Sequence, residues 1–210
     1  MEGISKESLQ RLPTYLRYLN ELHLNGIESV SSTTIADRFK LNPVTVRKDL
    51  AFISEDGGKP KTGFSVADLV AEISEFLGYN NTQDAVLVGV GKLGSALLGY
   101  KGFSNYGLNI VASFDCKTDI QIDSTKREIN NISMLPDLVK RLGVNIGIIT
   151  VPAESAQAVC DLMINSGIKA IWNFSPTHLI TPDNIAIKNE DMAASLAVLS
   201  QRLTAILKNE

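Results

Sequence analysis

The stretch from Ala85 to Leu98, "AVLVGVGKLGSALL", limits what this chain can fold into more than any other segment. An apolar run of strand length leads into Gly89, Gly91 and Gly94, and a helix-forming run follows. Each glycine of such a G-x-G-x-x-G spacing has a physical reason. The first permits a tight turn, the second lets backbone approach a pyrophosphate, and the third lets the helix pack closely on the strand. The segment therefore predicts a strand, turn and helix whose N-terminus holds a dinucleotide.

The region after this turn supplies the rest of a nucleotide site. Asp115 ends the next apolar run, 21 residues after Gly94, where a carboxylate bonds a ribose 2′-OH and repels a 2′-phosphate. NAD(H) is therefore expected in preference to NADP(H), although a turn and a capping acid without a ligand remain an alternative. Two later strand ends, "TVPAES" (150–155) and "NFSPTH" (173–178), lie where open α/β sheets bind ligands. The binding residues expected in them are Pro152, Ala153, Asn173, Phe174 and Pro176.

The hydrophobic pattern after residue 78 predicts a parallel sheet. Short apolar runs at 85–90, 108–115, 144–152, 168–174 and 184–189 are mostly separated by helical segments such as 153–166, which is typical of strands covered on both faces. The segment 117–133 has no pattern that supports a prediction. The last helical run has an apolar stripe that must be buried on something, and we expect it to pack against a partner subunit. The stripe consists of Leu196, Leu199, Leu203 and Ile206.

The first 64 residues have the pattern of three helices and a loop. A leucine stripe at helical spacing predicts the first helix, which begins or kinks at Pro13 and ends at Gly26. The serines at 31 and 32 offer N-caps for the second helix, and Asn42-Pro43 starts the third. The loop "EDGGKPKTG" reads as a hairpin, and 66–77 as an amphipathic linker helix. The stripe is formed by Leu9, Leu12, Leu16, Leu19 and Leu22.

This order of elements is the layout of a winged helix-turn-helix, whose third helix enters the DNA major groove. Arg47 can bond a guanine bidentately, a geometry that a lysine cannot reproduce. The wing lysines would meet phosphates or a minor groove. The expected DNA-contacting residues are Ser32, Thr45, Arg47, Lys48, Lys59 and Lys61.

Composition excludes several other classes of protein. The chain is 44% hydrophobic with a net charge of −3, so DNA binding must depend on local charge. No apolar run approaches the about 20 residues of a membrane span. Two separated cysteines, Cys116 and Cys160, argue against a disulfide framework or a zinc site and favour the cytoplasm. His178 is the one candidate for an acid–base group of a small NAD-dependent oxidoreductase, but it has no nearby arginine or lysine, so we expect no enzyme.

Segments along nearly the whole chain resemble the Rex family of redox-sensing transcriptional repressors. They include "RLPTYLRYLNEL", "VTVRKDL", "VGVGKLGSALLGYKGF", "TVPAESAQAV" and "NEDMAASL". The resemblance implies a homodimer that binds double-stranded, inverted-repeat operator DNA and releases it when NADH binds. The nucleotide domain also resembles the CoA-binding type, which leaves a CoA-responsive regulator as a further alternative.

The resemblance also implies roles for individual residues. Its phosphate loop corresponds to Gly89, Val90, Gly91, Lys92, Leu93 and Gly94. Three residues match positions tied to the redox switch, namely Arg17, Tyr100 and Asp191. In the switch we expect Asp191 to bond Tyr100 in one state and Arg17 or Lys48 in the other. The expected fold class is α/β, with a winged-helix domain and linker helix at 1–78 and a Rossmann-like NAD(H)-binding domain at 79–191. A C-terminal dimerisation helix at 192–210 is expected to be swapped between subunits.

Overall fold

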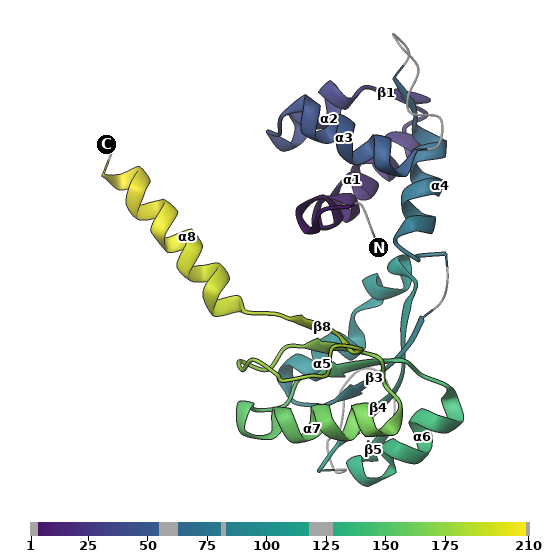
Figure 1. The fold of residues 1–210 in the computed structure, drawn as a ribbon, viewed down its shortest axis with the longest axis vertical. Coiled ribbons are helices and arrows are strands. Elements are labelled where there is room, and N and C mark those ends of the chain that lie inside the picture. The colour runs from purple at the N-terminus through teal and green to yellow at the C-terminus, as the bar shows by residue number, and fades with distance from the viewer. Residues whose placement is uncertain (1–3, 55–62, 81–82, 118–127, 209–210) are drawn as a thin grey trace. The chain divides into compact units, whose positions relative to one another are not determined.

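The computed structural model describes residues 4–54, 63–80, 83–117 and 128–208. The chain divides into two compact units, Met1–Asn81 and Thr82–Glu210 (Figure 1). Each unit has its own hydrophobic core. Within the described residues, no helix is long and apolar enough to span a membrane.

The first unit contains four helices and a short antiparallel ribbon. The helices are α1 (Lys6–Leu24), α2 (Ser32–Phe39), α3 (Pro43–Ile53) and α4 (Val66–Phe76), and β1 (Ser29–Val30) pairs with β2 (Phe64–Ser65). Side chains of Ser5, Ser31, Asn42 and Ser65 cap the four helices by accepting backbone N–H groups, as short polar residues do at N-termini. The expected caps of α2 and α3 are therefore confirmed. Helix α1 runs through Pro13 rather than starting there.

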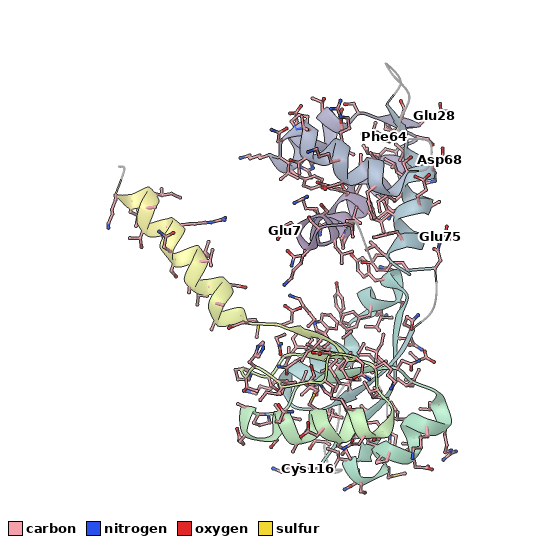
Figure 2. All side chains as sticks on the ribbon, viewed as in Figure 1. Glu7, Glu28, Phe64, Asp68, Glu75 and Cys116 are labelled. Atoms are coloured by element: carbon pink, nitrogen blue, oxygen red, sulfur yellow. The ribbon has the colours of Figure 1, made fainter. Side chains whose placement is uncertain are left out.

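The core of this unit is formed by one face of each helix. Leu12, Leu16 and Leu19 of α1 are fully or almost fully buried, which confirms the leucine stripe. Helix α4, expected only as a linker, adds Val66, Leu69 and Ile73 to the same core and presents Asp68 and Glu75 to solvent (Figure 2). It is thus a structural helix of the first unit.

The second unit is built on a parallel sheet with the order β5-β4-β3-β6-β7-β8. Its strands are β3 (Gln83–Val88), β4 (Leu108–Asp115), β5 (Ile129–Asn131), β6 (Ile146–Ile149), β7 (Ala170–Asn173) and β8 (Ala186–Asn189). The helices are α5 (Lys92–Gly99), α6 (Leu135–Leu142), α7 (Ala153–Ser166) and α8 (Met192–Leu207), with 3-10 turns η1 (Lys101–Tyr106) and η2 (Ile132–Met134). All five expected strands are present, and β5 and α6 are additional.

Both faces of this sheet are buried. In β3, Val86 and Val88 contribute to one core cluster with residues of α6 and α7, while Ala85 and Leu87 contribute to the other with Leu98 of α5. This is why the strand reads as a continuous apolar run rather than an alternating one. From β3 the chain continues to β4 on one side, and β6 lies on the other. The carboxyl ends of β3 and β6 therefore form the point at which open α/β sheets bind ligands.

Helix α8 is the exception to this burial. None of its residues is buried, and Leu196, Leu199, Leu203 and Ile206 are between 53% and 63% exposed. The expected apolar stripe is thus present on a helix that the described part of the chain leaves uncovered.

A partly buried ion pair between Arg11 and Asp49 ties α1 to α3 in the first unit. The carboxylate of Asp49 accepts from Arg11 Nε at 2.7 Å, from Arg11 Nη2 at 2.9 Å and from the Tyr15 hydroxyl at 3.0 Å. Burial alone would raise the pKa of Asp49, but these hydrogen bonds outweigh it and hold the pKa below its ordinary value. Because α3 also carries Arg47 and Lys48, this pair fixes the helix on which they stand.

Replacing Asp49 by alanine leaves the buried Tyr15 hydroxyl and the partly buried Arg11 guanidinium without their shared acceptor. We expect Asp49→Ala to lower the free energy of unfolding by about 3 kcal/mol in urea titrations at neutral pH. Asp37→Ala, at an exposed position on α2, is the matched control and should change it by less than about 0.5 kcal/mol. The stability supplied by Asp49 is present above the unfolded pKa of about 4 and is lost as pH falls through the lower, folded pKa. If the variant and the wild type still differed equally in free energy of unfolding at a pH where Asp49 is protonated, the ion pair would not be the source of the stability.

Candidate functional site

The turn between β3 and α5 is made by two glycines that have no room for a side chain. Gly89 has φ of +100°, and a Cβ there would lie 2.8 Å from the carbonyl carbon of Thr150. At Gly94 a Cβ would overlap the carbonyl oxygen of Gly89. Glycine is therefore required at position 89 by the positive φ and by the contact with the end of β6. At position 94 it is required by the close packing of α5 on the turn.

Gly91 is different, because a Cβ at this position would meet nothing within 4 Å. It is the N-cap residue of α5, and no side chain in the described part of the chain caps this helix start. The first N–H groups of α5 and their partial positive charge are therefore available to an anion. The open space above Gly91 lets that anion approach the backbone.

These residues open into a cavity of about 1270 Å³ at the carboxyl ends of the central strands. This volume exceeds the roughly 300–1,000 Å³ usual for small-molecule sites and admits a ligand the size of a dinucleotide. The cavity is lined by Val88, Gly89, Val90, Gly91, Lys92, Leu93, Ser95, Ala96, Asp115, Cys116, Lys117, Ile132, Thr150, Val151, Pro152, Ser155, Val159, Phe174 and Pro176.

Asp115, at the end of β4, joins that strand to the glycine turn. Its Oδ2 accepts the Val90 N–H at 2.7 Å, and its Oδ1 accepts the Lys117 N–H at 2.9 Å. Partial burial acts to raise the pKa of Asp115, but the backbone N–H groups of Lys117 and Val90 outweigh it and lower the pKa. The carboxylate is therefore held as an anion. Its oxygens keep lone pairs for a ribose hydroxyl, since a carboxylate can accept about four hydrogen bonds.

The other walls of the cavity are held by side chains that bond the backbone of neighbouring strands. The Thr150 hydroxyl contacts the carbonyl oxygens of Val88, at 3.1 Å, and of Gly89. Asn173 is fully buried and donates to the carbonyl of Thr177 at 2.8 Å and to Oδ1 of Asn189 at 2.8 Å. These bonds fix the loop that carries Phe174 and Pro176, so the β7 side of the cavity is preformed.

Most of the residues expected to bind a cofactor line this one cavity. The exceptions are Gly94, Ala153 and Asn173, which the lining does not include. Gly94 packs on the turn and Asn173 supports the loop from behind, while Ala153 begins α7. The structure also brings in Thr150 and Lys117, which sequence reasoning missed. Thr150 lies within the quoted "TVPAES" segment, but its contact with Gly89 depends on the pairing of β3 with β6.

On α3, the residues expected to read DNA lie outside the face that packs on the core. Val46 and Leu50 are buried, whereas Arg47 and Lys48 are exposed and Thr45 is partly exposed. Ser32 is the first residue of α2 and is partly exposed. Lys59 and Lys61, with the rest of the expected wing, lie outside the described residues.

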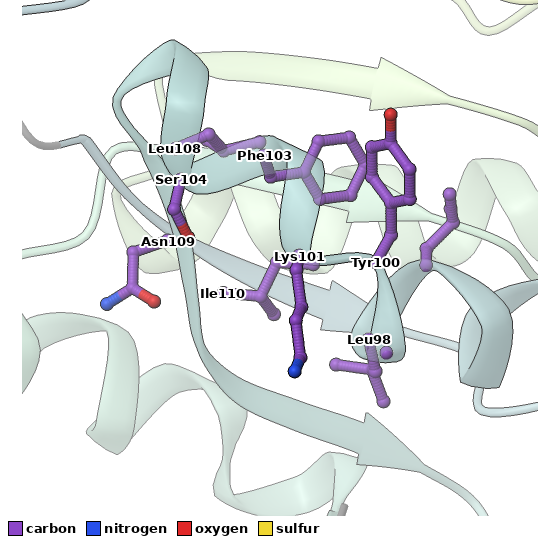
Figure 3. Close-up of a pocket in the computed structure, with 10 residues that line it drawn as sticks. Leu98, Tyr100, Lys101, Phe103, Ser104, Leu108, Asn109 and Ile110 are labelled. Carbon is purple, nitrogen blue, oxygen red and sulfur yellow. The ribbon is translucent and has the colours of Figure 1, made fainter.

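The three expected switch residues stand on different elements. Arg17 is an exposed residue of α1 in the first unit. Tyr100 follows α5, is 56% exposed and lies against Phe103, beside a smaller cavity of about 250 Å³ (Figure 3). Asp191 is the N-cap of α8, where Oδ1 accepts the Ala194 N–H at 2.8 Å.

Comparisons with known proteins agree with this arrangement. Residues 3–51 match the family model "Putative DNA-binding protein N-terminus", and residues 80–177 match the CoA binding domain. A redox-sensing transcriptional repressor Rex from Porphyromonas gingivalis is 43% identical over 97% of this chain and 93% of its own length. The chain belongs to the Rex family. A Rex repressor from Treponema denticola is 38% identical over 91% of each chain.

Solved structures support the same assignment. The crystal structure of RSP in complex with β-NAD⁺ and operator DNA matches with a TM-score of 0.88 at 30% identity, over 100% of this chain and 99% of that one. RSP in complex with β-NADH matches with a TM-score of 0.85 at 29% identity and the same coverage. RSP is described as a Rex-family repressor. The Rex resemblance expected from sequence is thus confirmed for both units.

The glycine turn of this Rex protein provides a direct test of the packing argument. We expect Gly94→Ala to lower the free energy of unfolding by about 1–3 kcal/mol in urea titrations, because its Cβ meets a backbone oxygen that cannot move aside. Gly99→Ala is a matched control in the same helix, since a Cβ there meets nothing within 4 Å. It should be neutral or stabilise by up to about 1 kcal/mol. Equal effects of the two substitutions would contradict the account.

Proposed function

We propose that this Rex protein is a homodimeric repressor that binds inverted-repeat operator DNA through α3 and releases it when NADH binds in the cavity beside Gly89. The observation that carries the proposal is the cavity itself, where an uncapped helix N-terminus, open space above Gly91 and an ionised Asp115 meet at one edge of the sheet. The RSP complexes with β-NAD⁺, β-NADH and operator DNA support the same assignment.

In the proposed complex, the pyrophosphate lies over Gly91 at the start of α5, with Lys92 adding a positive charge. Asp115 accepts a ribose hydroxyl. The turn between β3 and α5 is shaped by Gly89, Val90 and Leu93. Gly94 lets α5 pack closely on this turn. The remainder of the dinucleotide is flanked by Pro152, Ala153, Phe174 and Pro176. Asn173 holds the loop that carries Phe174 and Pro176.

The DNA half of the proposal assigns the major groove to the N-terminal part of α3. Arg47 reads a base edge, and Ser32, Thr45 and Lys48 contact the backbone or neighbouring bases. Lys59 and Lys61 are proposed to contact DNA from the wing. The second copy is recruited by the uncovered apolar stripe of α8, swapped between subunits. We therefore propose a DNA-binding domain at 1–78, an NAD(H)-binding domain at 79–191 and a dimerisation helix at 192–210. The protein is proposed to act on DNA in the cytoplasm.

The proposal includes no catalytic activity. His178, the residue on which an oxidoreductase would depend, is exposed and is not part of the cavity lining. A second candidate effector does have an observation in its favour, because residues 80–177 match the CoA binding domain. CoA carries a phosphate on its ribose, which would approach the carboxylate of Asp115. NADH, whose ribose hydroxyls are free, therefore fits the cavity better.

Calorimetry can test the nucleotide assignment. The wild type should bind NADH more tightly than NADPH or CoA. Asp115→Asn keeps an oxygen for the Val90 N–H but loses the charge, so the preference for NADH over NADPH should narrow about tenfold. Ser155→Ala, at another position that lines the same cavity, is the control and should keep the wild-type preference. Tighter binding of CoA than of NADH would transfer the effector role to CoA.

Binding to a fluorescent inverted-repeat duplex tests the role of α3. Arg47→Ala should weaken binding about tenfold and relax base preference at one position, whereas Lys48→Ala should reduce the salt slope by about one. Lys140→Ala, an exposed change of the same net charge on α6, should leave DNA affinity unchanged. A similar loss with Lys140→Ala would mean that charge alone, and not the position of Arg47, drives binding.

The switch residues are proposed to exchange partners. In this scheme, Asp191 bonds Tyr100 in one state and Arg17 or Lys48 in the other, so that NADH and DNA favour different states. Asp191→Ala should therefore reduce the NADH-induced drop in DNA affinity, measured by fluorescence anisotropy with and without saturating NADH. A full NADH response in this variant would contradict the exchange.

A further inference from the structure

A row of four aromatic rings runs across one face of the sheet in the second unit. Ring centroids are 4.9 Å apart for Tyr100 and Phe103, 5.6 Å for Phe103 and Trp172, and 4.7 Å for Trp172 and Phe174. Figure 3 shows the first of these pairs. Aromatic pairs at such distances attract each other, and closely packed side chains cannot move independently. A displacement at one end of the row therefore reaches the other rings.

One end of this row lies in the large cavity. Phe174 is part of its lining, and its backbone N–H donates to the carbonyl of Ile149 at 2.8 Å. Because this bond fixes the backbone of Phe174 to the sheet, a ligand that presses on this wall acts mainly on the ring. The next ring in the row is that of Trp172.

Trp172 also holds the residues that lead into α8. Its Nε1–H donates to Oε1 of Glu190 at 2.9 Å. The backbone N–H of Glu190 donates to the carbonyl of Asn173 at 2.8 Å, and the next residue, Asp191, caps α8. A hydrogen bond from an indole to a carboxylate is charge-assisted and stronger than one between neutral groups. One side chain thus contacts both the cavity wall and the segment before α8.

We propose that Trp172 is a positioning residue through which the contents of the nucleotide cavity control the start of α8. Its ring follows Phe174, and its indole N–H sets the position of Glu190 and thereby the direction in which α8 leaves the sheet. The inference rests on the proposed function and names the element that transmits the nucleotide signal. In this scheme, NADH and NAD⁺ affect the start of α8 differently only because they place the ring of Phe174 differently.

The test compares three substitutions in the full-length protein. Trp172→Phe keeps an aromatic ring but removes the N–H donor, and Glu190→Ala removes the acceptor. Lys188→Ala is the matched control, because Lys188 Nζ lies 3.8 Å from Oε2 of Glu190 and its loss leaves the indole bond intact. For each protein, DNA affinity is measured with and without saturating NADH, on a duplex that the wild type selects from a randomised inverted-repeat pool. NADH affinity is measured separately by calorimetry.

The coupling factor, the ratio of the two DNA dissociation constants, should fall about tenfold in Trp172→Phe and in Glu190→Ala. The separate affinities for NADH alone and DNA alone should change less than about threefold, which a merely structural role of Trp172 would not produce. The coupling factor of the double variant, Trp172→Phe with Glu190→Ala, should be no lower than that of either single variant, because both substitutions remove the same bond. If Trp172→Phe does not fold, Glu190→Ala carries the test, since it leaves every ring in place.

Trp172 is the single tryptophan of the chain, so its fluorescence tests the bond without DNA or nucleotide. Its emission maximum should shift in Glu190→Ala and stay unchanged in Lys188→Ala. The inference is overturned if this shift is absent, if both bond-breaking variants keep the wild-type coupling factor, or if Lys188→Ala lowers that factor equally. A wild type that binds NADH yet keeps its DNA affinity would overturn the proposed function itself, and the inference with it.

Discussion

The contact between the glycine turn and the end of β6 is the constraint on which the second unit depends. Two backbones meet there without space for a side chain, at Gly89 against Thr150 and at Gly94 against Gly89. This contact places the start of α5 at the edge of the sheet, and the space above Gly91 follows from it. The bond from the Val90 N–H to Asp115 then brings β4 to the same point. One packing requirement thus brings together, from three strands, the uncapped start of α5 and the Asp115 carboxylate, which are the proposed anion site and ribose acceptor.

Much of this could be predicted from the sequence because the signals are local. The glycine spacing, the caps at Ser31 and Asn42 and the leucine stripe of α1 each reflect interactions within about one helical turn. The strands of the parallel sheet were predictable because burial on both faces leaves continuous apolar runs. β5 has only three residues, Ile129–Asn131, and lies within the segment 117–133, which has no hydrophobic pattern, so it gave no such signal.

What the sequence could not supply are the contacts between distant segments. The hydroxyl of Thr150 lies against Gly89 only because β6 pairs with β3, and Asn173 supports the β7 loop only because β8 lies beside it. The bond between Arg11 and Asp49 joins residues 38 positions apart. Both residues are charged and had no pattern to mark them as buried partners. The same holds for Trp172, whose bond to Glu190 depends on the pairing of β7 with β8.

In the proposed function, one chain couples a nucleotide cavity to a helix that reads DNA. Linkage requires that the factor by which NADH weakens DNA binding equals the factor by which DNA weakens NADH binding. A factor of about 100 needs about 2.7 kcal/mol of differential contact, which one or two buried charged hydrogen bonds can supply. The most direct measurement titrates NADH, and separately NAD⁺, into the protein bound to a fluorescent inverted-repeat duplex at one fixed salt concentration. We expect NADH to release the DNA at concentrations where NAD⁺ has little effect. DNA binding that is indifferent to both nucleotides would show that the cavity and α3 are not coupled.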